Sequence, residues 1–264
     1  MLSSPANLWR RRHLIRVLVT SNIKRQSRHS SLGYLWWLID PLLMTAVYYV
    51  VVSILFKHGG HNQPYILFLM CGLLPWKAFS DSVSQSVGAI KASAGIIKAI
   101  SFPKAVLPLS FVLSNLIFFG FALMVLVGLA LAYGPQYGTW PGAAYLWLPG
   151  IALVQLVFTA GVALIVSTLG VIFSDTSNII GHILRMAYFL SPGLYSVEQI
   201  PQKFRIWFGL NPFSGIMESY RAIVMHNQAP PLPQLGQAAA IAAATLLAGY
   251  WLFRSREGYF VQRL

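Results

Sequence analysis

Long apolar segments, separated by short polar or charged ones, set the pattern of this chain. A helix needs about 20 predominantly apolar residues to cross the hydrocarbon core of a bilayer. Six segments are close to that length or longer, at 32–56, 63–84, 105–133, 144–173, 178–196 and 233–253. The pattern therefore predicts an all-α integral membrane protein with six transmembrane helices, built as a single domain over residues 1–264.

The N-terminal segment, residues 1–30, is basic and has only a partial apolar face. Leu14, Ile15 and Leu18 supply that face. Because basic amphipathic helices bind in the plane of the membrane interface, we predict an amphipathic interface helix on the cytoplasmic surface. A disordered basic tail is the alternative.

Two connections between the predicted spans are not simple polar loops. Residues 85–104 have helical character and end at Pro103. Residues 197–231 are too apolar and aromatic to lie wholly in water, and Asn211-Pro212 interrupts them. We predict that this longer connection forms short re-entrant helices in the outer leaflet, between the fifth and sixth spans.

The charge distribution adds an orientation. The chain is 56% hydrophobic and only 9% charged, with a formal net charge of +13. Seven Lys/Arg precede residue 30, three lie near the C-terminus, and four lie between these clusters: Lys77, Lys91, Lys98 and Lys104. On the other side of the predicted membrane lie four: Lys57, Lys203, Arg205 and Arg221. By the positive-inside rule, both termini of this multi-pass protein are cytoplasmic, in the cytoplasmic (inner) membrane. Because the basic clusters alternate with apolar spans, no nucleic-acid partner is expected.

The sequence contains few signs of catalytic chemistry. It has no GxxxxGK[ST] loop for ATP, no HExxH and no Cys/His cluster with metal-ligand spacing. Cys71 is the only cysteine, so an intramolecular disulfide is excluded. The six acidic residues are scattered, which argues against a paired-carboxylate site. We therefore expect no cofactor, metal site or catalytic residue in this chain. A membrane enzyme acting on lipid-linked sugar and an ion or small-solute channel are the alternatives to a transport subunit.

Four stretches together suggest a family. They are SSLGYLWWLIDPLLM (30–44), GLLPWKAFSDSVSQS (72–86), IIKAISFPKAVLPLS (96–110), and LSPGLYSVEQIPQ (190–202) followed by LNPFSGIMESYR (210–221). Their order and spacing resemble the ABC-2 type permeases that export lipid-linked polysaccharides, a group that includes O-antigen, capsule and wall teichoic acid exporters. The family usually has Asn before the proline of its first span, whereas this chain has Asp40.

The resemblance implies a complex and a mechanism. Two permease chains form a homodimer, and two separate nucleotide-binding ATPase subunits, which carry ATP and Mg²⁺, dock beneath it. ATP binding opens a path between the permeases, within membrane lipid, for an undecaprenyl-linked glycan. The 85–104 segment matches the region that couples to the ATPase, with these contact residues: Gly95, Ile96, Ile97, Lys98, Phe102 and Lys104. A connector lying on lipid without a partner is the alternative.

Residues 197–226 match the outer gate helices of the family. The gate residues that this match implies are Phe204, Trp207, Phe208, Asn211 and Pro212. Anchoring at the membrane interface is the alternative role for each aromatic ring, because Trp and Tyr gather at bilayer interfaces.

Asp40 lies in an otherwise apolar span, and an acid at a helix centre costs about 2.5–3.5 kcal/mol to insert. We expect it to bond to a polar group on another helix, with Arg185, Asn115 and Gln155 as candidates, or to face the glycan. Snorkelling to lipid headgroups is a third account. Aromatic residues nearby would complete a glycan-facing track; the proposed substrate-path residues are Tyr34, Trp36, Trp37, Asp40 and Tyr48.

Overall fold

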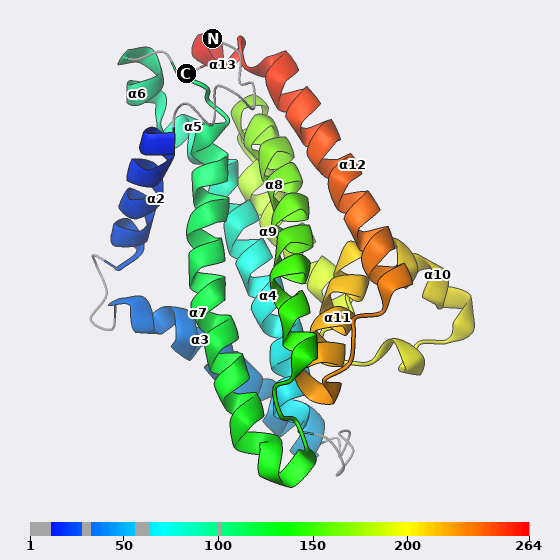
Figure 1. The fold of residues 1–264 in the computed structure, drawn as a ribbon. Coiled ribbons are helices and arrows are strands. Elements are labelled where there is room, and N and C mark those ends of the chain that lie inside the picture. Colours follow the sequence, from blue (N-terminus) through cyan, green and yellow to red (C-terminus); the bar gives the residue numbers. More distant parts are fainter. Residues whose placement is uncertain (1–11, 28–32, 56–63, 100–101, 264) are drawn as a thin grey trace.

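The computed structural model describes residues 12–27, 33–55, 64–99 and 102–263, and this part of the chain is helical with no strand (Figure 1). The all-α prediction is confirmed there. The longer helices are α2 (Arg12–Ser27), α3 (Trp36–Tyr48), α4 (Tyr65–Val87), α7 (Val106–Tyr137), α8 (Leu148–Ile172), α9 (Thr176–Phe189), α10 (Gln202–Leu210), α11 (Pro212–His226) and α12 (Leu232–Arg256). The shorter ones are η1 (Gly33–Leu35), the π-helical η2 (Tyr49–Leu55), α5 (Ala89–Ala92), α6 (Ala94–Ala99), η3 (Ala143–Trp147), η4 (Val197–Gln199) and α13 (Phe260–Arg263).

Four helical segments of the described chain are long and apolar enough to cross a membrane: α4, α7, η3 with α8, and α12. They correspond to four of the six predicted spans. The predicted first span is α3 continued by η2. The predicted fifth span is only the 14-residue α9, which at 1.5 Å per residue is about 21 Å long, against a hydrocarbon core of about 30 Å.

The fifth predicted span is cut short by its own sequence. Pro192 lacks a backbone N–H and disfavours helical geometry at Ser191, so α9 ends at Phe189. The chain then turns through residues 190–195 instead of continuing as a helix.

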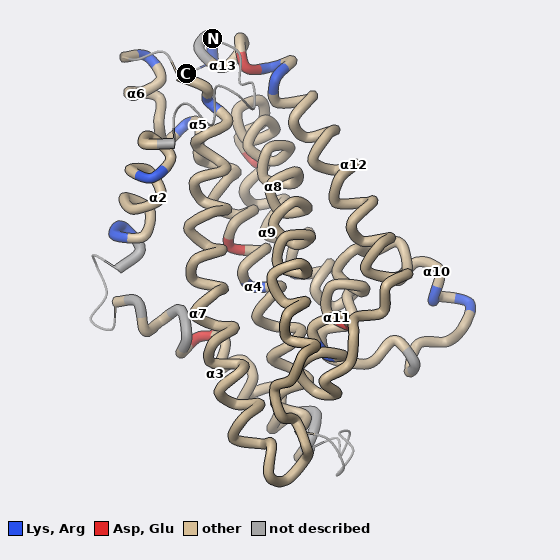
Figure 2. The backbone as a smooth tube through the Cα atoms, viewed as in Figure 1, with Lys and Arg blue, Asp and Glu red and all other residues tan. Residues whose placement is uncertain are grey.

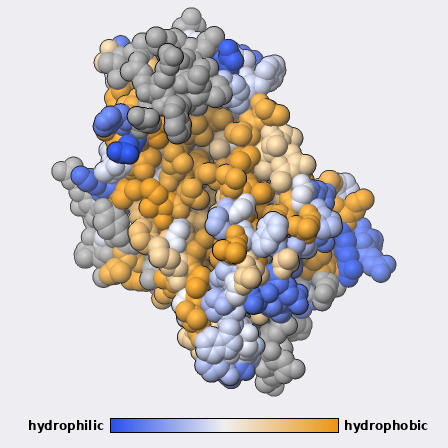
Figure 3. Space-filling view, in the orientation of Figure 1, coloured by the Kyte–Doolittle hydropathy of each residue, from blue (hydrophilic) through white to orange (hydrophobic). Residues whose placement is uncertain are grey.

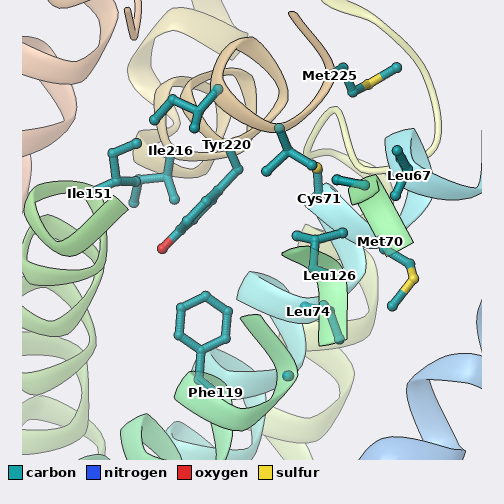
Figure 4. Close-up of a cluster of buried hydrophobic side chains, with 14 of the residues drawn as sticks. Leu67, Met70, Cys71, Leu74, Phe119, Leu126, Ile151, Ile216, Tyr220 and Met225 are labelled. Atoms are coloured by element: carbon teal, nitrogen blue, oxygen red, sulfur yellow. The ribbon is translucent and has the colours of Figure 1, made fainter. Parts of the chain in front are cut away.

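The largest buried cluster joins α4, α7, α8 and α11 (Figure 4). Its central ring is Tyr220 of α11, which packs edge-on against Phe119 of α7 with ring centroids 5.9 Å apart. The Tyr220 hydroxyl donates to Gln155 Oε1 at 3.2 Å, and Gln155 Nε2 donates to the Pro75 carbonyl at 3.1 Å. A single amide on α8 thus connects α11 to α4 and satisfies the buried hydroxyl.

Close packing of α12 on α8 depends on small residues. A Cβ added to Gly161 would lie 2.6 Å from the Leu246 backbone nitrogen, and one added to Gly249 would collide with the Gly161 carbonyl. Such residues let helix backbones approach closely. A second row of small residues, spaced four apart on α12, also suggested a packing face from the sequence. Its members are exposed in this chain: Gly236, Ala240, Ala244 and Ala248.

Helix α2 packs lengthwise on α7. Val19 is buried, and Asn22 Nδ2 donates to Ser110 Oγ at 3.0 Å. The Arg25 guanidinium lies 5.5 Å from the centroid of the Phe111 ring. A helix therefore exists within the predicted N-terminal interface segment, while residues 1–11 and 28–30 of that segment lie outside the described part.

Helices α5, α6 and α13 lie at one end of the bundle, and the described chain ends there at Arg263 (Figure 1). Lys and Arg residues gather at this end, and a second, smaller group lies on α10 (Figure 2). Apolar side chains cover much of the middle of the face seen in Figure 3, with hydrophilic ones toward the opposite end and over α10. This belt is what a lipid-facing surface requires.

Candidate transport path, gate and coupling surface

Asp40 is paired, and its partner is Lys77. Lys77 Nζ lies 2.7 Å from Asp40 Oδ2, and 3.1 Å from Asp81 Oδ2 one helical turn further along α4. None of the three partner candidates suggested by the sequence is correct. Lys77 escaped notice because the charge pattern assigned it to the cytoplasmic cluster, whereas it lies near the middle of the 23-residue α4.

The three rejected candidates bond elsewhere. Arg185 Nε donates to the Gly181 carbonyl at 3.2 Å, within its own helix. Asn115 Nδ2 lies 3.4 Å from Gln85 Oε1, and Gln155 serves the α4–α11 bridge described above. The polar-partner account of Asp40 therefore holds in kind, but with a different residue.

The Asp40–Lys77–Asp81 cluster is partly exposed at the surface of the protein. The Asp40 side chain is 49% exposed, against 25% for Lys77 and 33% for Asp81. Two carboxylates surround one ammonium group, so the cluster carries a formal charge of −1. It forms a polar spot on an apolar face of α3, where Trp36 and Met44 are also exposed. A face of this kind can contact a polar chain that passes along it.

The predicted path residues separate into two groups. Trp36 and Asp40 lie one turn apart on α3 and are both accessible. Tyr48 is half-buried at the far end of α3, where its ring lies 6.3 Å from that of Tyr188 on α9. The side chains of Tyr34 and Trp37 are not among those that the structure describes. The structure thus brings the ends of α3 and α9 together beside α4.

The predicted gate consists of an exposed helix and a buried one. Helix α10 has no buried residue, and Phe204 and Trp207 are 48% and 68% exposed. Phe208 is half-buried, with its ring 6.1 Å from that of Tyr195. Helix α10 therefore presents aromatic rings outward, as either a gate or an interface anchor would.

Asn211 and Pro212 define the corner between these helices. Asn211 is the N-cap of α11, with Oδ1 accepting from the Phe213 N–H at 3.0 Å, and Pro212 occupies the first helical position. The Asn211 amide also donates to Ser191 Oγ at 2.8 Å, which ties the corner to the turn after α9.

Arg221 is a functional candidate that the sequence pattern missed. It is only 3% exposed, with Nη1 donating to Glu218 at 2.9 Å and Nη2 to the Gly193 carbonyl at 3.0 Å. Its guanidinium also lies 3.6 Å from the centroid of the Phe68 ring. Burial lowers the pKa of Arg221, and the Glu218 carboxylate opposes that shift. The spacing of Glu218 and Arg221 within apolar α11 was the signal available.

The turn that Arg221 holds is also pressed against α4. A Cβ added to Gly72 would lie 2.8 Å from the Gly193 oxygen, so only glycine fits there. The Tyr65 hydroxyl donates to the Leu194 carbonyl at 2.9 Å. Residues 191–194 are therefore fixed between α4 and α11, at the root of the predicted gate.

The predicted coupling residues also differ in burial. Ile97 and Phe102 are 7% and 5% exposed and pack with Phe253 and Phe260 from the C-terminal helices. The Lys104 backbone N–H donates to Glu257 Oε1 at 3.0 Å. These three residues hold the segment to the body of the protein. The exposed members of the set are Gly95, Ile96 and Lys98.

Comparison with known proteins identifies the family. Residues 13–225 match the family described as ABC-2 type transporter. The chain belongs to that family. The match to the ABC-2 transporters begins in α2 and ends in α11, so it includes the Asp40 cluster and the predicted outer gate.

Relatives of this ABC-2 transporter include proteins that are named for export or transport. The O-antigen export system permease protein RfbA of Myxococcus xanthus is 32% identical over 266 residues, covering 100% of both chains. A protein of the same name from Klebsiella pneumoniae is 32% identical over 81% of each chain. The polysialic acid transport protein KpsM of Escherichia coli is 24% identical over 92% of this chain and 93% of its own.

Proposed function

We propose that this chain is the membrane-spanning permease subunit of an ATP-driven ABC exporter, moving a lipid-linked polysaccharide of the O-antigen or capsular type across the cytoplasmic membrane. The observation that carries the proposal is the end-to-end similarity to an O-antigen export permease. ATP and Mg²⁺ bind to a separate ATPase subunit. Two copies of that subunit dock on a permease homodimer. The chain itself supplies the path.

The proposed path follows the accessible face of α3 that bears Trp36 and Asp40. Aromatic rings stack on sugar rings, and carboxylates accept bonds from sugar hydroxyls, so this face suits a glycan. Helix α9 also packs on α4, and its exposed apolar residues, such as Ile183 and Met186, suit contact with the second copy.

Orientation and coupling follow from the charged end of the bundle. We place both termini and the α5–α6 segment in the cytoplasm, because Lys and Arg gather there (Figure 2). Six spans result if α3–η2 makes the first crossing and α9, extended by the turn at residues 190–195, makes the fifth. The ATPase would contact the exposed Gly95, Ile96 and Lys98, while α10 and α11 form the re-entrant outer gate.

The test is deletion of this gene in its host. Surface polysaccharide should disappear, lipid-linked glycan of unchanged chemical structure should accumulate, and a plasmid copy should restore export. Inactivating the cognate ATPase should reproduce the phenotype. A permease acting as a channel would not need the ATPase, and loss of an enzyme would alter the structure of the accumulated glycan; either result would overturn the proposal.

A further inference from the structure

A polar stripe runs along the outward face of α9. Asn178, His182 and Arg185 recur at spacings of four and three residues, so they share one face of the helix, and all three are exposed. The opposite face packs on the bundle, where Leu184 and Tyr188 are buried. Helix α9 therefore turns an arginine away from the body of its own chain.

Arg185 lies at nearly the same depth as the Asp40 cluster. Tyr188, three residues further along α9, has its ring 5.6 Å from the ring of Trp76, which is the neighbour of Lys77 in α4. Three residues of helix rise about 4.5 Å, so Arg185 lies within about one turn of the level of Lys77. Lys77 in turn bonds to Asp40. Both outward charges therefore lie beside the middle of α4, a helix long enough to cross the membrane.

Among the described residues, Arg185 has no acidic partner. Its Nε donates to the Gly181 carbonyl at 3.2 Å and its Nη2 to His182 Nδ1 at 3.2 Å, while the ion pairs of this part of the chain involve other residues. Ionisable residues at membrane depth normally pair with one another or face a polar interior. A group outside this chain must therefore supply the negative charge for Arg185.

The Asp40 cluster has the complementary need. It carries a formal charge of −1, and the Asp40 side chain is 49% exposed. Asp40 Oδ2 faces Lys77, which leaves Oδ1 for a further donor. One chain thus presents a cation on α9 and an anionic cluster on α3 and α4, turned outward at nearly the same depth.

A second copy of this chain satisfies both groups at once. Two copies inserted in the same orientation are related by a two-fold axis along the membrane normal, and rotation about such an axis keeps every residue at its depth. In an isologous interface, a contact from one group to another is made twice, once in each direction. An axis that passes between the two charged groups places Arg185 of each copy opposite Asp40 of the other.

We infer that Arg185 of one copy forms an ion pair with Asp40 of the other, and that this pair occurs twice in the dimer. Exposed apolar side chains lie beside both groups, Met44 on α3 and Ile183 and Met186 on α9, and would pack around the pairs. The inference rests on the homodimer of the proposed function and adds which groups meet in it. Because the family usually has Asn in place of this Asp, the charge pair would be a feature of this chain.

The first test is cross-linking between two distinguishable copies. In a Cys71→Ala background, one full-length copy carries Asp40→Cys and a His tag, and the other carries Arg185→Cys and a FLAG tag. After coexpression with the ATPase, membranes are treated with bismaleimidoethane, a short thiol cross-linker. A band that carries both tags is expected. The control pairs Asp40→Cys with Trp251→Cys on α12, a residue that is 71% exposed and should give no such band.

The second test measures the charge itself. Arg185→Glu sets a carboxylate against the anionic cluster of the other copy, and should raise the dissociation constant of the full-length dimer in detergent at least about tenfold. Arg185→Lys keeps the charge and should stay close to wild type. Adding Asp40→Asn to Arg185→Glu should recover part of the loss, because the repulsion falls. Lys203→Glu, a charge reversal at an exposed position of α10, is the control and should leave the dissociation constant unchanged.

The outcomes separate this inference from the proposed function. If the two tags copurify but Asp40→Cys and Arg185→Cys do not cross-link, the homodimer stands and the pair is wrong. If Arg185→Glu stops export while the dissociation constant is unchanged, Arg185 acts on the passing substrate, which also overturns the pair. If the two tags do not copurify at all, the homodimer of the proposed function fails as well.

Discussion

Lys77 Nζ on α4 lies 2.7 Å from Asp40 Oδ2 on α3. The pair connects the helix that bears the proposed glycan face to the centre of the bundle. It also gives a physical reason for Asp at a position where the family usually has Asn, because the carboxylate shares the neutralisation of a lysine placed midway along a membrane helix.

Removing the lysine should do more harm than neutralising Asp40. Lys77→Met leaves Asp40 and Asp81 unpaired, and we expect it to lower the free energy of unfolding by about 1–3 kcal/mol, less than for a fully buried pair because the cluster is partly exposed. Asp40→Asn keeps an acceptor for Lys77 and should cost less than about 1 kcal/mol. Thermal unfolding in detergent measures both changes. Adding Asp40→Asn and Asp81→Asn to Lys77→Met should restore most of the loss, and failure of that rescue would show that charge pairing is not the cause.

Gly72 should tolerate no side chain. Gly72→Ala places a methyl group against the Gly193 carbonyl and should destabilise the protein by about 1–3 kcal/mol. Gly120→Ala on α7 is the control, because an added Cβ there meets nothing within 4 Å. It should be neutral or stabilising by up to about 1 kcal/mol, since Ala favours helix over Gly. Equal melting temperatures for the two variants would contradict the close approach of the turn to α4.

The ATPase should bind through the exposed part of the α5–α6 segment. Ile96→Asp places a charge on a side chain that is 45% exposed and should weaken copurification with the ATPase, by about 2 kcal/mol if Ile96 is a central contact. Ile97→Asp would instead disrupt the chain's own packing, because Ile97 is buried. Gln136→Asp, at the other end of α7, is the control. Unchanged copurification of the Ile96 variant would move the contact elsewhere.

The proposed orientation predicts a labelling pattern. In a Cys71→Ala background, chosen because Ser would bury a hydroxyl in the apolar cluster, cysteines at Gln136 and Gln228 should react with an impermeant thiol reagent from outside intact cells. Cysteines at Ser93 and Ser255 should react only after the membrane is opened. Labelling of Ser93 from outside would reverse the orientation.

Trp36 provides the test of the glycan face on α3. If its ring stacks on a sugar, Trp36→Ala should lower surface glycan per assembled complex by roughly fivefold, since stacking of this kind is worth on the order of 1 kcal/mol. Trp36→Phe should recover most of the export. Trp251→Ala on α12 removes an equally large ring that is 71% exposed and should change nothing. Wild-type export by Trp36→Ala would exclude the track.

Local signals in the sequence were sufficient for much of the fold. Run length and hydropathy located α4, α7, α8 and α12, because the hydrocarbon core imposes a minimum length on any helix that crosses it. The break at Asn211-Pro212 could also be predicted from the sequence, because an N-cap and a proline at the first helical position act on the chain within a few residues. Four short stretches in order were enough to suggest the family.

Only the tertiary structure decided which residues meet. The rotation and packing of separate helices decide three of these contacts. They are the ion pair of Asp40, the hydrogen bond from Arg221 to the Gly193 carbonyl and the burial of Ile97. Periodicity tells which residues share one helix face, but it carries no information about which face of another helix lies opposite. Charge counting failed at Lys77 for that reason: the rule assumes that a lysine lies in water, whereas this one pairs with Asp81 of its own helix and with Asp40, which the fold brings to it from α3.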